Sequence, residues 1–262
     1  MSIIPMTYTP FEIRVLPILF YYLFLSTFGV LISIKMYYKW RERNVPPPLY
    51  LTLVFSFLSI ALIMLSIGLA EAAITGFYKE VYRFSLPFAY SMVIVANIFL
   101  FIFTSNITNK GKKAFNLIIV ISVIIIILLF LPWNWWGVPS EDYAGKLNIR
   151  LISTVSLVIY SYSIYGYIAF ICRKLKPKAE NKVMFVGLSL LFYSMISLIL
   201  FFLMLIADTL MIILFDHPGY SFFTYIAWIF GIIFIILIYL SLIMPDWLVN
   251  WINKKYRDSS NS

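Results

Sequence analysis

The chain has 262 residues and a formal net charge of +9, and it is 63% hydrophobic but only 12% charged. A soluble domain averages about 25% charged residues, and a single core could not hide this much apolar surface from water. The composition therefore excludes an ordinary water-soluble fold, and a single cysteine, Cys172, excludes an intrachain disulfide.

Seven uncharged runs, each of 20 residues or more, follow one another along the chain. A helix needs about 20 apolar residues to cross the hydrocarbon layer, where backbone groups find no water partners. We therefore expect an all-α polytopic membrane protein, a seven-transmembrane-helix bundle without the short alternating strands of a membrane barrel. The expected spans cover residues 13–36, 49–74, 84–108, 114–132, 150–172, 183–214 and 220–245.

The connections between these spans alternate in charge. One set, together with the C-terminal tail, holds fifteen of the twenty Lys and Arg residues, whereas the other set holds five. Short loops rich in Lys and Arg stay in the cytoplasm, so we expect the N-terminus outside and the C-terminus inside a cell membrane. Residues 1–250 then form a single transmembrane domain and residues 251–262 a short cytoplasmic tail. The basic loops would face anionic lipids, so the positive net charge is explained without a nucleic-acid partner.

The segment "IGLAEAAITGFYKEVYRF" (67–84) places charges between the second and third predicted spans. Glu71 and Arg83 lie at this outer edge, and Arg150 and Asp208 end other spans at a similar level. Opposite charges attract strongly at this depth because the local dielectric is low. We expect Glu71 to pair with Arg83 or Arg150, and three interpretations stay open. The four charges tie helices together, line a polar pocket that binds a ligand, or simply extend their charged ends into water at the membrane surface.

Two further polar residues lie near the middle of predicted spans. Asn97 is a lone amide in the third span, and lipid offers it no partner, so it should face the bundle. Tyr160 belongs to a stripe on the fifth span, which is made of Ser153, Ser156, Tyr160, Ser163 and Tyr167. Interhelical packing and ligand contact both remain open for these residues.

Enzymatic chemistry is not expected. The chain contains no HExxH, no GxSxG and no Gly-rich phosphate loop. The predicted spans hold almost no ionisable side chains that could act as general acids, bases or nucleophiles. His217 is the one histidine, and a metal site needs three or four ligands. We therefore expect no catalytic residues, no metal and no cofactor.

Two stretches carry a resemblance to a known family. One is "GLAEAAITGFYKEVYRF", a small-residue and Glu helix end followed by a charged aromatic turn, and the other is "YLSLIMPDWL", which closes the seventh span. With seven spans in this orientation, the chain resembles the seven-helix membrane sensor region that precedes prokaryotic histidine kinases. The resemblance implies a role in signal transduction. No kinase or cyclase output follows in this chain, so signalling would pass through a separate cytoplasmic protein.

The sequence leaves two classes of function open. In the first, the protein is a membrane sensor that binds a small or lipidic ligand near its outer rim and signals through a cytoplasmic partner. In the second, it is a small-solute transporter or a structural subunit of a membrane complex. A transporter should place polar groups or broken helices near the midplane, where Asn97 and the Tyr160 stripe qualify.

Overall fold

The computed structural model describes residues 8–108, 111–131, 135, 149–215, 217 and 219–258, and for residues 108, 150, 213 and 255–258 the backbone alone. The chain divides into two compact units, Met1–Ser161 (the first unit) and Tyr162–Ser262 (the second unit), with the boundary inside one helix. Within the described ranges, seven helices are long and apolar enough to cross a membrane. The predicted number of long apolar helices is therefore confirmed.

Helices account for most of both units, with η marking a 3-10 helix. The first unit contains β1 (Thr9–Pro10), η1 (Ile13–Val15), α1 (Leu16–Arg43), α2 (Pro46–Thr75), β2 (Phe77–Tyr78), α3 (Glu80–Thr108), η2 (Lys112–Ala114), α4 (Phe115–Leu129) and the start of α5 (Arg150–Leu175). The second contains the rest of α5, η5 (Lys176–Lys178), α6 (Lys182–Phe215), α7 (Phe222–Ile243) and α8 (Asp246–Asp258).

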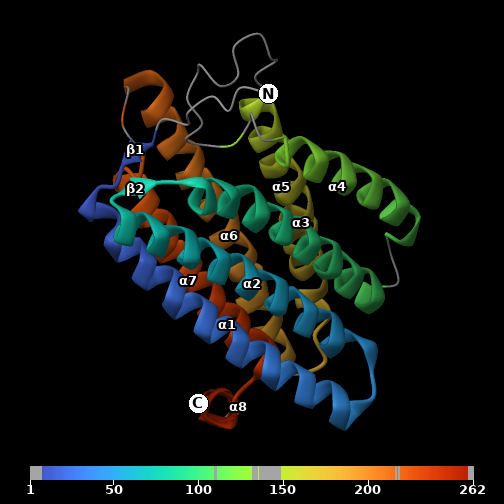
Figure 1. Cartoon of the computed structure of the whole chain (residues 1–262). Helices are drawn as coiled ribbons and strands as arrows, with labels where there is room; N and C mark the ends of the chain where they lie inside the picture. The colour runs from blue at the N-terminus through green and yellow to red at the C-terminus, as the bar shows by residue number, and fades with distance from the viewer. Residues whose placement is uncertain are drawn as a thin grey trace. The chain divides into compact units, whose positions relative to one another are not determined.

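Helices α1, α2 and α3 lie side by side in the first unit, in blue to green in Figure 1. Small side chains let α1 and α2 approach closely. Ser33 donates its hydroxyl to the Thr52 carbonyl oxygen at 3.0 Å and lies 2.7 Å from the Ser56 hydroxyl. A Cβ added at Gly29 would collide with the Ser59 Oγ. These contacts follow the rule that small residues form the interfaces of helices in membranes.

Proline and glycine set the turns between these helices. Asn44 ends α1 in the left-handed region with φ 49°, and Pro46 begins α2 at a position where its missing N–H is no loss. Gly76 ends α2 with φ 76°, a conformation that glycine adopts without steric cost. Helix α1 thus continues to Arg43, well past the end of the span predicted at residue 36, because helices extend beyond the hydrocarbon layer until a turn residue stops them.

In the second unit, α6 and α7 form an antiparallel pair joined by serine hydroxyls. Ser197 donates to the Phe230 carbonyl oxygen and Ser241 donates to the Gly187 carbonyl oxygen, both at 2.8 Å. The Tyr162 hydroxyl on α5 donates to the Ile199 carbonyl oxygen at 3.0 Å. Each bond crosses between helices, so hydroxyl groups fix the register in an otherwise apolar unit.

Large apolar side chains cover much of the outer surface of these helices. Those exposed on α1 and α4 include Phe20, Phe24, Leu31, Leu117, Val120, Ile124 and Ile127. Soluble monomers rarely expose apolar patches larger than a few hundred Å², so water is the wrong solvent for these faces. The exposed side chains fit lipid contact, as expected for helices of this length and composition.

Helix α8 is an element that the sequence analysis did not anticipate. It runs from Asp246 to Asp258 and so includes part of the tail expected over residues 251–262. The helix follows Pro245, and its first turn carries Asp246, an acid that favours a helix N-terminus. The sequence criterion of long uncharged runs could not find it, because its 13 residues mix apolar and charged side chains.

The contact between α2 and α3 at Gly68 gives the first prediction. A Cβ added there would lie 2.9 Å from the Ser85 Cβ and 3.0 Å from the Tyr82 Cα. We expect Gly68→Ala to lower the free energy of unfolding by about 1–3 kcal/mol, the usual cost of overpacking. Gly166→Ala is the matched control, since nothing lies within 4 Å of a Cβ there. Thermal melts of detergent-purified variants measure both, and equal melting temperatures would contradict the close packing of α2 on α3.

Candidate functional site

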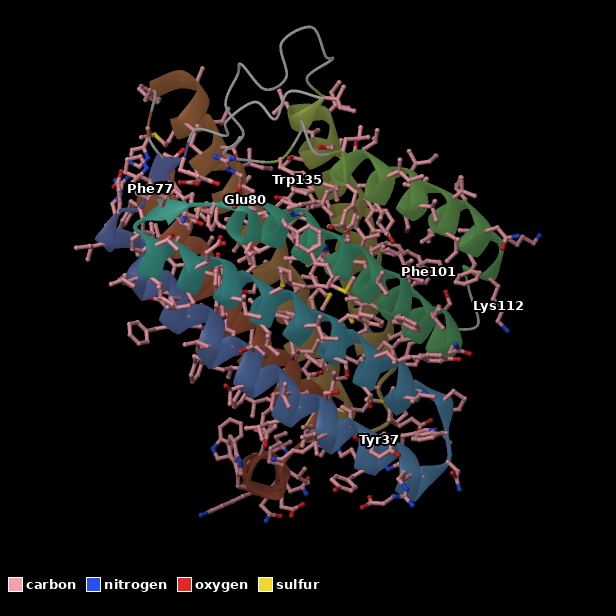
Figure 2. All side chains as sticks on the ribbon, in the orientation of Figure 1. Tyr37, Phe77, Glu80, Phe101, Lys112 and Trp135 are labelled. Atoms are coloured by element: carbon pink, nitrogen blue, oxygen red, sulfur yellow. The ribbon has the colours of Figure 1, made fainter. Side chains whose placement is uncertain are left out.

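The N-terminal segment is hydrogen-bonded through its backbone to the connection between α2 and α3. Strand β1 pairs antiparallel with β2, with Thr9 opposite Tyr78 and Pro10 opposite Phe77. The Phe11 N–H donates to the Gly76 carbonyl oxygen at 2.8 Å, which extends the pairing by one bond. We call residues 8–11 and 76–80, with Glu71 and Arg83, the junction cluster. In Figure 2 its labelled members Phe77 and Glu80 lie at one end of the first unit, and Tyr37 lies at the other.

Glu71 reaches from α2 to the start of α3. Its Oε2 accepts a hydrogen bond from the Tyr82 backbone N–H at 3.0 Å. The first N–H groups of a helix have no partner inside the helix, and its N-terminus attracts negative charge. Glu71 therefore supplies the missing acceptor to α3 from a neighbouring helix. The predicted ion pair with Arg83 or Arg150 stays a prediction, although Tyr82 is the residue next to Arg83.

Tyr8 and Glu80 tie the N-terminal segment to α3 by side chains. The Tyr8 hydroxyl donates to the Glu80 Oε1 at 2.6 Å. That hydrogen bond is the largest cause that raises the pKa of the Tyr8 phenol above its ordinary value of 10.0. The phenol thus stays protonated at neutral pH and remains the donor of this bond.

Arg83 is the largest fully buried side chain of the described residues, with 1% of its surface exposed. Its guanidinium carbon lies 5.7 Å from the centre of the Tyr8 ring, and the Lys79 Nζ lies 5.4 Å from the same ring. Cations are attracted to aromatic faces at such distances. Negative charge on Glu71 and positive charge on Arg83 both act on the Tyr8 phenol, so the junction cluster is electrostatically coupled.

Asn97 and Tyr160 each bond to a serine on another helix. The Asn97 Nδ2 on α3 donates to the Ser161 Oγ on α5 at 3.1 Å, and the amide is buried with 3% exposure. One residue earlier on α5, the Tyr160 hydroxyl accepts from the Ser122 Oγ on α4 at 2.8 Å. Adjacent residues of α5 thus join it to α3 and α4, and the two pairs satisfy polar groups that lipid would leave without partners.

Asp208 belongs to the second unit and has a role like that of Glu71. Its Oδ1 accepts a hydrogen bond from the Ser221 backbone N–H at 2.6 Å, and Ser221 is the N-cap of α7. The carboxylate therefore closes the connection between α6 and α7. Arg150 begins α5, but its side chain lies outside the described part of the chain.

The structure thus brings Glu71 and Arg83 to one junction, and it joins Asn97 to Ser161 on α5 and Tyr160 to Ser122 on α4. Sequence reasoning missed Tyr8, Ser122 and Ser161. Two-residue strands carry no periodic signal, so nothing in the N-terminal segment pointed to its pairing with β2. The serines look like the small residues found throughout membrane helices, and only their contacts distinguish them.

The junction cluster gathers several charged and polar side chains. Within the ranges that the structure describes, no group of three or more His, Cys, Asp and Glu side chains gathers as a metal site would require. The junction cluster combines a buried guanidinium, two carboxylates, an ammonium and two phenols, which are groups that bind charged or hydrogen-bonding ligands.

Comparison with known proteins finds no relative. No protein-family model, no curated protein sequence and no solved structure matches the chain.

The Glu71 contact gives the second prediction. Glu71→Leu removes the acceptor of the Tyr82 N–H, and we expect it to lower the free energy of unfolding by about 0.5–2 kcal/mol, as other lost helix caps do. Glu71→Gln keeps an acceptor oxygen and should cost less. Glu12→Gln is the control, because Glu12 pairs with Arg14 at an exposed site, where ion pairs contribute little.

Thermal unfolding of the three purified variants ranks these effects. Equal stability of wild type and Glu71→Leu would contradict a stabilising role for the backbone contact. The predicted ion pair is tested separately: if the two charges pair, Glu71→Arg combined with Arg83→Glu should restore the stability that each single change removes.

Proposed function

We propose that this protein is a receptor-like membrane module whose junction cluster binds a small or lipidic ligand with an anionic group. In the proposed orientation the cluster lies at the outer rim, and the basic helix ends face the cytoplasm. Binding would be passed to a separate cytoplasmic signalling protein.

The burial of Arg83 carries the proposal. Taking a guanidinium out of water is costly unless it is paired and hydrogen-bonded, and an ionisable residue inside a membrane bundle is by default a candidate for function. Arg83 lies at 1% exposure on the first turn of α3, beside the Tyr8 ring. A purely apolar side chain could pack at this helix end without the desolvation cost of a guanidinium. We therefore infer that the charge of Arg83 has a role in function.

The chemistry of the cluster favours an anion. A guanidinium presents a planar fork of donors that fits carboxylate or phosphate oxygens with two parallel bonds. Lys79 adds a second cation near the same ring, and the N-terminus of α3 favours negative charge. A carboxylate or phosphate group, free or on a lipid, is the ligand class that these groups recognise.

The same contacts suggest how binding reaches the rest of the unit. The N-terminal segment, α2 and α3 meet at the cluster through the strand pair, the Glu71 bond and the Tyr8–Glu80 bond. A ligand shifts an equilibrium only if it binds two states differently. An anion that competes with Glu80 or Glu71 for the nearby cations would favour a state in which this junction is loosened, and α2 and α3 would shift relative to each other.

A second candidate is solute transport, which the Asn97–Ser161 and Ser122–Tyr160 pairs favour. Polar side chains deep inside an apolar bundle are typical of transporters with a binding site near the midplane. Both pairs are also adequate as interhelical bonds, so transport is the weaker candidate. Uptake of solute into liposomes that stops in Asn97→Leu would decide for it.

Mass spectrometry of bound species tests the receptor proposal, as the third prediction. We expect the full chain, purified with native lipids, to retain an anionic compound that Arg83→Gln loses by about tenfold or more, since bonds to charged groups contribute roughly 1.5–3 kcal/mol. Arg14→Gln is the control, because Arg14 is exposed and pairs with Glu12 at the same end of the first unit.

Arg83→Lys is the control for a folding defect in Arg83→Gln, because it keeps the positive charge and loses only the planar guanidinium. It should fold and still bind the compound weakly. The proposal would be contradicted if wild type and Arg83→Gln retained the same compounds at the same level. It would also be contradicted if wild type retained no anion.

A further inference from the structure

Helix α8 has two different faces. Leu248 and Ile252 are buried, at 7% and 0% exposure, and α8 packs against α6. Trp247 and Trp251 are exposed on the other face, at 63% and 54%. Two indoles that are more than half exposed, one helical turn apart, are an unusual feature for a surface in contact with water, since they are the largest apolar side chains.

The start of α8 is held firmly to the α6–α7 pair. Met244 ends α7 in the left-handed region with φ 48°, and its Cε lies 2.7 Å from the position of a Cβ at Gly187. Ser241 bonds to the Gly187 carbonyl oxygen, and the Pro245 carbonyl oxygen accepts from the Leu248 N–H at 2.9 Å. In Figure 1 α8 is seen nearly end-on and α7 along its length, so the chain turns sharply between them.

This end of the second unit is strongly basic. The Ser241–Gly187 bond places the end of α7 next to the first turns of α6. Basic residues whose side chains the structure describes precede and begin α6 and follow the tryptophans in α8: Arg173, Lys174, Lys176, Lys178, Lys182 and Lys254. The described acids of the same segments are fewer, namely Glu180 and Asp246. Since α8 packs against α6, the segments that adjoin the indoles are complementary to negative charge.

We propose that α8 is a membrane-surface helix that inserts Trp247 and Trp251 into the headgroup layer of an anionic phospholipid bilayer. Indoles prefer that layer, where an apolar ring and a polar N–H are both satisfied. Basic side chains beside them attract anionic headgroups. An amphipathic helix with indoles on its exposed face and a lysine on the same face has the composition of helices that lie in the interface plane.

Anchoring of α8 in the headgroup layer would also affect the helices α6 and α7. Its buried face is fixed to α6 and its first turn to α7, so a helix seated in the headgroup layer holds the ends of both. Removal of anionic lipid would release α8 from the surface and free the turn at Met244 and Pro245. The lipid composition of the surrounding leaflet thus biases the packing of this end of the second unit.

Fluorophore accessibility tests the proposal, as the fourth prediction. Asn250 shares the exposed face with Trp247, Trp251 and Lys254 by its spacing of three and four residues. A fluorophore is attached at Asn250→Cys in the full chain carrying Cys172→Ala, and the protein is reconstituted into vesicles of phosphatidylcholine with or without phosphatidylglycerol. We expect quenching by aqueous iodide to fall about threefold when phosphatidylglycerol is present, and quenching by bromine-labelled lipid to rise.

Two variants separate the indoles from the charges. Trp247→Ala with Trp251→Ala should abolish the protection from iodide, and Lys254→Glu should reduce its dependence on phosphatidylglycerol. A fluorophore at Glu180→Cys is the aqueous control, and melting temperatures show that each variant is folded. Equal iodide quenching in both vesicle types would overturn the proposal. So would protection that occurs only in native membranes, which would point to a protein partner on this face.

Discussion

The solvent that surrounds the helices is the constraint on which the rest of this structure depends. Lipid offers no hydrogen-bond partner to a peptide group, so long apolar segments must satisfy their backbones internally as helices. It also removes most of the hydrophobic drive that packs helices in water, because a leucine gains little by leaving one apolar phase for another. Close backbone approach and occasional hydroxyl bonds are left to hold the bundle, as at Gly68 beside Ser85 and at Ser241 on Gly187.

The same constraint explains where charged residues are useful. Inside the apolar layer a carboxylate needs a donor, and the start of a helix offers several N–H groups without partners. Glu71 uses one at α3 and Asp208 uses one at α7, each in its own unit. Both acids therefore close a helix–helix connection from the preceding helix. Arg83 is different, because it is a buried cation at such a helix start, and this difference singles out the junction cluster as the candidate site.

Much of the fold could be predicted from the sequence, because the position and length of each uncharged run indicate where a long apolar helix lies. The seven apolar helices follow from those runs, and Asn97 is buried as an amide in an apolar helix should be. Helix α8 could not be found in this way, since its indoles and lysines look like an ordinary tail. The pairing of β1 with β2 could not be found either, because two residues carry no periodic pattern.

The candidate site was predicted in its location more than in its contacts. The charged seam between α2 and α3 could be read from the sequence, but the contact of Glu71 with a backbone N–H could not. A sequence shows which side chains are charged, so ion pairs are easy to predict from it. It does not show which backbone N–H groups lack a partner at the start of a helix, so contacts with them are missed. Tyr8 enters the cluster only through the strand pair, so a residue distant in sequence became a neighbour of Glu80.

The side of the membrane on which each helix end lies tests the account most directly. Single cysteines at Phe77 and at Lys178, each in a chain carrying Cys172→Ala, are treated with an impermeant maleimide in intact cells. The account predicts that the cysteine at position 77 reacts at once and that the one at 178 reacts only after the cells are permeabilised. Reaction at 178 from outside intact cells would contradict it, because the junction cluster would then face the cytoplasm.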